Sequence, residues 1–109
     1  MKAKLGIKPI SVNQCWQGKR YKTKTYKDFE KAMLLLMPKG GVFCPPYRVD
    51  LIFGFSTSTS DIDNPIKPVL DIIQKKYNIN DRDIYEINVT KKVVKKGNEY
   101  IYYEINSTF

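Results

Sequence analysis

Several stretches of this chain alternate apolar and polar residues, which is the period of a β-strand with one buried face. The clearest is residues 47–55, whose alternate positions are apolar: Tyr47, Val49, Leu51, Phe53 and Phe55. Residues 4–10 predict a short first strand that Pro9 ends. Residues 84–94 and 100–105 predict two more strands, and the turn at 95–98 predicts that they form a hairpin.

Two other stretches have the three- and four-residue spacing of amphipathic helices. The first covers about 26–37, with these apolar positions: Phe29, Ala32, Met33, Leu36 and Met37. The second begins at Asn64 or Pro65 and ends near Tyr77, because Asn is a good N-cap and Pro fits the first turn. Its expected core positions are these: Ile66, Val69, Leu70, Ile73 and Tyr77.

The elements follow one another as β-α-β-α-β-β, and this order predicts the fold class. We expect an α/β protein with a small mixed β-sheet and two helices, forming a single domain over residues 1–109. Residues 11–27 have neither period over their length, so we expect a long functional loop between the first strand and the first helix.

The composition excludes several classes of protein. Apolar residues make up 42% of the 109 residues, which predicts a soluble globular protein, and no run approaches the roughly 20 apolar residues of a membrane span. The first residues lack the apolar core of a secretory signal, so we expect a cytoplasmic location. Histidine is absent, which excludes catalytic triads that use histidine. Cys15 and Cys44 are too few for a zinc site and are expected to be packing thiols.

Charge is unevenly distributed along the chain. The formal net charge is +8, and residues 1–40 hold ten Lys and Arg against two Asp and Glu, whereas residues 41–109 hold nine of each kind. This surplus predicts a surface for nucleic acid near the N-terminus, and a solvated basic surface is the alternative. On the terminal strands, Lys91, Lys92, Lys95 and Lys96 either extend that surface or protect an edge strand from pairing.

The expected loop at 11–27 carries the basic residues with aromatic residues between them. The candidate phosphate contacts are Lys19, Arg20, Lys22, Lys24 and Lys27. The candidates for stacking on exposed bases are Trp16, Tyr21 and Tyr26. The alternative is a solvated loop whose aromatic side chains pack on the domain.

Acidic residues gather in one part of this basic protein. If the segment from Asp61 to Asp63 is extended, both carboxylates project to one side, and Asp81, which follows the second helix, can complete the set. Such a group repels phosphate unless a cation lies between them, and Mg²⁺ prefers oxygen ligands. Lys67, one helical turn after Asp63, would then lie near the metal and contact the scissile phosphate.

Both features have structural alternatives that the spacing leaves open. Asp61, Asp63 and Asn64 have the residue types of a turn and an N-cap before a helix. Lys67 can equally belong to an i,i+4 series with Asp63 and Asp71, which is worth only about 0.3–0.5 kcal/mol per pair on an exposed helix.

The acidic segment resembles the central motif of the RusA-type Holliday junction resolvases. In that family a run Asp-x-Asp-Asn-x-x-Lys-x-x-x-Asp opens a helix and a further Asp follows it, as residues 61–71 and Asp81 do here. Asn13, in the run Pro9-Ile10-Ser11-Val12-Asn13, is similar to the Pro-x-Ser-x-Asn element that follows the family's first strand. The likeness covers most of the chain, but only the central motif is specific.

The resemblance implies a homodimeric, Mg²⁺-dependent endodeoxyribonuclease, with Mn²⁺ as a substitute, that makes paired nicks across four-way DNA junctions in recombination and repair. It implies Asp61, Asp63 and Asp81 as metal ligands, Lys67 as the catalytic lysine and Asn13 as a contact to DNA. The chain departs from the family at Ser60, where a basic residue is common, and at Asn80, where an Asp is common. Asp83 is therefore an alternative to Asp81 as third ligand, and we favour Asp81.

Two other functions are compatible with the same residues. One is a binding module for branched DNA or RNA that has no catalytic activity, in which the acids only cap the helix. The other is a metal-dependent nuclease that cuts flaps or RNA.

Overall fold

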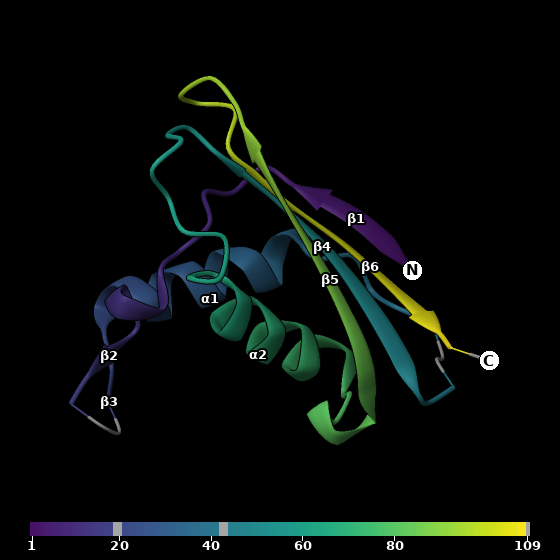
Figure 1. Ribbon diagram of the computed structural model, residues 1–109. Helices are drawn as coiled ribbons and strands as arrows, with labels where there is room; N and C mark the ends of the chain where they lie inside the picture. Colours follow the sequence, from purple (N-terminus) through teal and green to yellow (C-terminus); the bar gives the residue numbers. More distant parts are fainter. Residues whose placement is uncertain (19–20, 42–43, 109) are drawn as a thin grey trace.

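The computed structural model describes residues 1–18, 21–41 and 44–108, and a four-stranded mixed sheet is its central element (Figure 1). The order of the strands across the sheet is β1-β6-β4-β5. Their bounds are β1 Lys2–Leu5, β4 Tyr47–Phe55, β5 Ile84–Val93 and β6 Tyr100–Ser107. The predicted α/β class and the mixed sheet are confirmed.

The sheet contains one parallel pair and two antiparallel pairs. β4 and β5 run parallel and are joined by α2 (Ile66–Tyr77), while β6 runs antiparallel to both β4 and β1. The predicted hairpin of the last two strands is therefore wrong, because β4 lies between them. The burial pattern gives the reason: β6 buries Ile101, Tyr103 and Ile105 and takes a central place, whereas β5 is largely exposed and forms an edge.

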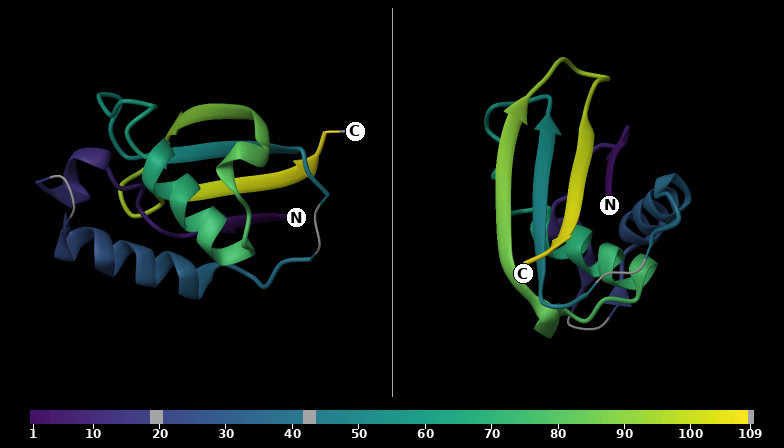
Figure 2. Two further views of the ribbon diagram at one scale, coloured as in Figure 1. Left: turned by 90° about the horizontal axis from the view of Figure 1, so that it is seen from below. Right: turned by 90° about the vertical axis from the view of Figure 1, so that its right-hand side faces the viewer.

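Both helices cover the same face of the sheet (Figure 2). α1 (Lys24–Leu36) begins after Thr23, whose side chain accepts a hydrogen bond from the backbone N–H of Tyr26. Phe29, Met33 and Met37 are buried as predicted, whereas the predicted core residues Ala32 and Leu36 are exposed. No helix in the described part of the chain is long and apolar enough to cross a membrane.

The core lies between this helical layer and the sheet. From β4 it receives the predicted alternate residues, and from α2 it receives Val69, Ile72 and Ile73, of which Ile72 was not predicted. The other predicted residues of this stripe, Ile66, Leu70 and Tyr77, are partly buried and pack against the core. The first strand is also shifted, because β1 lies at Lys2–Leu5 and not at 4–10.

Residues 11–27 do not form one long loop. They contain the short 3-10 helix η1 (Val12–Gln14), the paired strands β2 (Trp16–Gln17) and β3 (Tyr21–Lys22), and the start of α1. The backbone N–H of Thr23 donates to the carbonyl of Cys15, which fixes this segment against α1. Cys15 is buried as predicted, but Cys44 is exposed, so the prediction that both are packing thiols is wrong for Cys44.

Candidate functional site

The acidic segment lies at the surface where the chain passes from β4 to α2. The connector before it is held by the Lys91 ammonium, which donates to the carbonyl oxygens of Ser58, at 2.7 Å, and of Ser60. Asp61 and Asp63 are both exposed. Residues 62–65 form turns and not an extended strand, so alternation along a strand does not explain how the two carboxylates are oriented.

The N-terminus of α2 does not use these acids as caps. The cap position is Pro65, which makes no side-chain hydrogen bond, so the prediction of Asn64 as the N-cap is wrong. Asp63 contributes only its backbone carbonyl, which accepts from the N–H of Ile66 at 3.1 Å. Within the described residues, the carboxylates of Asp61 and Asp63 make no hydrogen bond or ion pair with another side chain. These two carboxylates therefore remain available to a ligand.

Asp81 lies at the other end of α2. It opens the short 3-10 helix η2 (Asp81–Asp83), directly before Ile84, and Ile84 pairs with Tyr47 at the start of β4. Asp61 instead follows the end of β4. The 12 residues of α2 span about 18 Å, so Asp63 and Asp81 are separated by roughly that length.

The expected centre of Asp61, Asp63 and Asp81 is consequently not assembled within one chain. Among the described residues, no three His, Cys, Asp or Glu side chains are grouped so that they could hold a metal ion. The oxygen donors of Asp61 and Asp63 fit Mg²⁺ in kind, and the ion typically takes only one or two carboxylates besides substrate phosphate. One chain thus fits part of a magnesium site, and Asp83 cannot replace Asp81 because it belongs to the same η2 turn.

Lys67 lies one turn into α2 and is well exposed. Its ammonium forms an ion pair of 3.4 Å with Asp71. Of the i,i+4 series Asp63–Lys67–Asp71, the Lys67–Asp71 pair is therefore present. No ion pair between Lys67 and Asp63 occurs in the part of the chain that the structure describes. Lys67 and Asp71 border an open groove between α2 and β5, which Asp81 closes at its far end.

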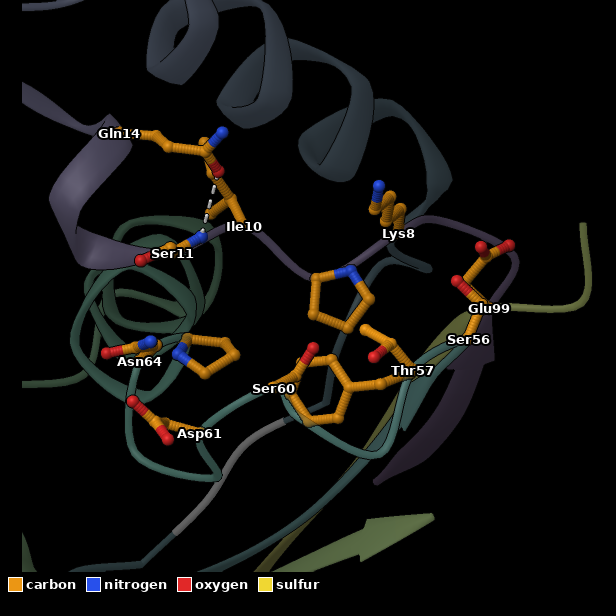
Figure 3. A pocket seen from close by; sticks show the side chains of 13 residues that line it. Lys8, Ile10, Ser11, Gln14, Ser56, Thr57, Ser60, Asp61, Asn64 and Glu99 are labelled. Atoms are coloured by element: carbon orange, nitrogen blue, oxygen red, sulfur yellow. Dashed lines mark hydrogen bonds between the residues drawn. The ribbon is translucent and has the colours of Figure 1, made fainter. Parts of the chain in front are cut away.

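A second pocket adjoins Asp61, with a volume of about 200 Å³ (Figure 3). Asp61 and Asn64 lie on one side of it, below Ser11 and Gln14 of the η1 turn, and Lys8 lies on the other side. The backbone N–H of Val12 donates to the carbonyl of Asn64 at 2.9 Å and so joins this turn to the acidic segment. Asn13, which follows Val12, is exposed in η1 and is therefore placed close to the segment.

Some residues of this pocket could not be found from the sequence. Lys8 and Gln14 belong to no motif, and they reach the site only because the chain folds back between β1 and η1. The nearest sequence signal was the Pro-x-Ser-x-Asn run, which marks the correct segment. Ser11 of that run accepts a hydrogen bond from the N–H of Asn13 and caps η1.

The basic residues that are candidates for phosphate contact differ in whether their side chains form ion pairs within the protein. Lys22 forms an ion pair of 3.0 Å with Glu30, and Lys24 forms one of 3.1 Å with Asp28. Lys27 is exposed and, among the described residues, has no ion pair. Lys19 and Arg20 lie outside the described residues, so nothing is said of their contacts.

The aromatic candidates also separate into two kinds. Tyr26 is buried in the first turn of α1, so the expectation that it stacks on bases is wrong, and its packing on the domain matches the alternative. Trp16 is 37% exposed and meets the Tyr26 ring edge-on, with 5.7 Å between centroids. Tyr21 is 75% exposed and remains free to stack.

Glu30, a residue of α1, links β3 to both helices. Its carboxylate accepts hydrogen bonds from Lys22 at 3.0 Å and from Lys75 of α2 at 2.8 Å. Burial alone raises the pKa of Glu30, but the bonds from the two lysines outweigh it and leave that pKa below its usual value. The carboxylate is therefore charged at neutral pH and joins β3 to α1 and to the last turn of α2.

Comparison with known proteins gives no match, neither to a protein-family model nor to a curated protein. The family resemblance consequently rests on the motif residues themselves.

Proposed function

We propose that this protein is a metal-dependent endodeoxyribonuclease of the RusA type, which nicks branched DNA such as four-way junctions. One observation carries the proposal. Asp61 and Asp63 are exposed in a turn, neither caps α2, and neither carboxylate has a side-chain partner among the residues described.

Unpaired carboxylates next to a DNA-binding surface have a physical cost. They lie on a chain of net charge +8, and they repel the phosphates that such a chain attracts. A divalent cation removes this conflict, because it binds the carboxylates and the phosphate oxygens together. When bound, Mg²⁺ or Mn²⁺ would activate a water molecule and neutralise the charge that develops on the phosphate.

Asp61 and Asp63 would hold the metal, and Lys67 would act on the substrate. The Lys67 ammonium is exposed at the groove beside the acidic turn, where a compact cation can contact a phosphate or the departing oxygen. Asp71, at 3.4 Å from that ammonium, would orient it. This pair favours Asp71 as a positioning residue rather than a ligand.

DNA would reach the acidic turn across η1 and the β2–β3 hairpin. Asn13 is exposed beside Asn64, and Trp16 and Tyr21 present aromatic surface on the same small sheet. Lys27 is exposed on the adjoining helix and has no ion pair among the described residues, and Lys22 and Lys24 can also exchange their carboxylate partners for phosphate. Stacking on unpaired bases at a branch point is the contact that would favour junctions over duplex.

The test is cleavage of an immobile four-way junction beside matched duplex, flap and RNA, with and without Mg²⁺. We expect paired, Mg²⁺-dependent nicks in the junction. Tight junction binding without cleavage under Mg²⁺ or Mn²⁺ would show a binding module instead. Faster cutting of the flap or the RNA would support a metal-dependent nuclease with a different substrate.

A further inference from the structure

Lys91 differs from the other lysines at its end of the sheet. Its side chain is half-buried, whereas those of Lys92, Lys95 and Lys96 are exposed. Lys91 of β5 lies opposite Phe53 in the parallel pair with β4, and residues paired in this way point to the same face of a sheet. Because Phe53 is fully buried, Lys91 also extends over the helical face. Lys91 is therefore placed to make contacts within the protein.

The ammonium of Lys91 is bonded to backbone carbonyl oxygens. It donates to the carbonyl of Ser58, at 2.7 Å, and to the carbonyl of Ser60, and it lies 5.9 Å from the centroid of the Phe55 ring. In the described part of the chain, no carboxylate pairs with it. Hydrogen bonds from a charged donor are roughly twice as strong as those between neutral groups. Two of the three ammonium donors thus bind the segment that ends at Asp61.

These two bonds join residues 58–60 to the sheet. The other side-chain bonds of this stretch are local, because the N–H and the hydroxyl of Thr59 both bond the hydroxyl of Thr57. Of the described residues, only Lys91 and the adjacent Thr57 form hydrogen bonds with this stretch. The stretch ends directly before Asp61. Lys91 thus fixes the chain where it enters the acidic segment.

The placement of Asp61 and Asp63 depends on this backbone. Both are exposed and have no side-chain partner among the residues described, so no contact of the carboxylates themselves orients them. After Asp63 the chain is fixed by the N–H of Val12, which donates to the carbonyl of Asn64 at 2.9 Å. Mg²⁺ requires a nearly ideal octahedron of oxygen ligands, so its affinity depends on how well those oxygens are placed before it binds. Lys91 provides the corresponding bond on the side of Asp61.

We propose that Lys91 is a positioning residue of the metal site: it holds the backbone before Asp61 and thereby raises the affinity of Asp61 and Asp63 for a divalent cation. The inference rests on the proposed function, because that function makes these two carboxylates metal ligands. Without the ammonium, the cation itself would have to order the segment before Asp61. Ordering the backbone of a single residue weakens binding on the order of tenfold.

Manganese binding in the absence of DNA tests this role. Mn²⁺ is the probe, because its free electron paramagnetic resonance signal falls as the ion binds. The wild-type chain should bind Mn²⁺ saturably, and Asp63→Asn should lose that binding. Lys91→Met, which removes the ammonium and keeps an unbranched side chain beside Phe55, should bind Mn²⁺ about tenfold more weakly. Equal or tighter binding by Lys91→Met would overturn the role of Lys91.

Lys92→Met is the matched control for the loss of charge. Lys92 is the next residue of β5, is exposed, and lies opposite Gly54, so it points to the other face of the sheet. Each variant loses one positive charge from the net charge of +8, so the long-range repulsion of a cation falls in both. Lys92→Met should bind Mn²⁺ at least as tightly as the wild type. A loss as large as that of Lys91→Met would overturn the specific role of Lys91.

Backbone motion provides a second measurement, which needs neither metal nor DNA. In the wild type, the amide order parameters of Thr59 and Asp61 from NMR relaxation should be near the value of about 0.85 for rigid backbone, and in Lys91→Met they should fall below about 0.6. Leu51, buried in the middle of β4, should keep its value in both proteins and so show that the fold is intact. Unchanged order parameters at Thr59 and Asp61 in Lys91→Met would overturn the proposed hold.

Failure of this role and failure of the proposed function give different results. A wild-type chain without saturable Mn²⁺ binding would reject the metal-dependent nuclease, and the role of Lys91 with it. Mn²⁺ binding that Asp63→Asn abolishes and Lys91→Met leaves unchanged would reject the role of Lys91 alone. If Lys91→Met also binds the junction more weakly in a metal-free gel-shift assay, with Mn²⁺ affinity unchanged, Lys91 contacts phosphate instead.

Discussion

Replacing Glu30 by Gln tests the electrostatic contact that joins β3 to α1 and to the last turn of α2. The change keeps the shape of the side chain but removes the charge that accepts hydrogen bonds from Lys22, at 3.0 Å, and from Lys75, at 2.8 Å. A hydrogen bond to a charged group contributes about 1.5–3 kcal/mol when well shielded, and an exposed ion pair contributes about 0–1 kcal/mol.

The exposure of the three side chains places the expected loss of unfolding free energy between these limits. The side chain of Glu30 is 14% exposed, but those of Lys22 and Lys75 are 36% and 60% exposed, so solvent screens much of the attraction. We expect Glu30→Gln to lower the free energy of unfolding by about 1–2 kcal/mol. In thermal unfolding this corresponds to a fall in Tm of roughly 5–10 °C.

The pH dependence of this loss follows from the pKa of Glu30. Because folding lowers that pKa below its usual value of 4.5, the carboxylate stabilises the folded state fully above that value, and the stabilisation disappears as the pH falls through the folded-state pKa. The difference between wild type and Glu30→Gln should therefore be present at neutral pH and shrink in acid below pH 4.5. Urea unfolding followed by circular dichroism, at neutral pH and below pH 4.5, measures this difference in stability.

Asp28→Asn is the matched control for this experiment. It removes the ion pair of Asp28 with Lys24, whose side chains are 65% and 90% exposed, and should cost no more than about 0.5 kcal/mol. Equal stabilities of wild type and Glu30→Gln at neutral pH, or a loss of the same size in acid, would refute the argument.

Three further predictions concern catalysis, DNA binding and the core. Lys67→Ala should slow junction cleavage and leave junction binding unchanged in a gel-shift assay, and normal turnover would reduce Lys67 to a surface residue paired with Asp71. Lys27→Ala should make the slope of log K against log salt shallower by about 0.9 if Lys27 contacts one phosphate, and an unchanged slope would exclude that contact. Phe53→Ala, in the fully buried centre of β4, should lower the free energy of unfolding by about 3–5 kcal/mol in urea titrations, and a loss below 1 kcal/mol would contradict that packing.

The fold could be predicted from the sequence wherever one period dominates. The alternation along residues 47–55 gave the bounds of β4 without error, and the spacing of Val69 and Ile73 identified the buried side of α2. The place of β6 could not be predicted from local pattern, because strands that follow each other along the chain usually pair. Here the more deeply buried β6 takes the centre and leaves β5 at the edge.

The candidate site was predictable in its residues but not in its geometry. The motif marks Asp61, Asp63 and Lys67, and the structure places all three at one exposed end of α2. Asp81 is close to them in sequence, but α2 lies between them, so Asp81 is at the opposite end of that helix. The pairing of Lys22 with Glu30 and the burial of Tyr26 depend on how α1 packs, and no spacing in the sequence encodes them.

The most direct test of the central claim compares wild type with Asp63→Asn on an immobile four-way junction in Mg²⁺, with binding and nicking measured on the same samples. The account predicts paired nicks by the wild type and none by Asp63→Asn, although both bind the junction and Asp28→Asn cuts normally. Nicking by Asp63→Asn at the wild-type rate, or binding by the wild type with no nicking in either Mg²⁺ or Mn²⁺, would contradict it.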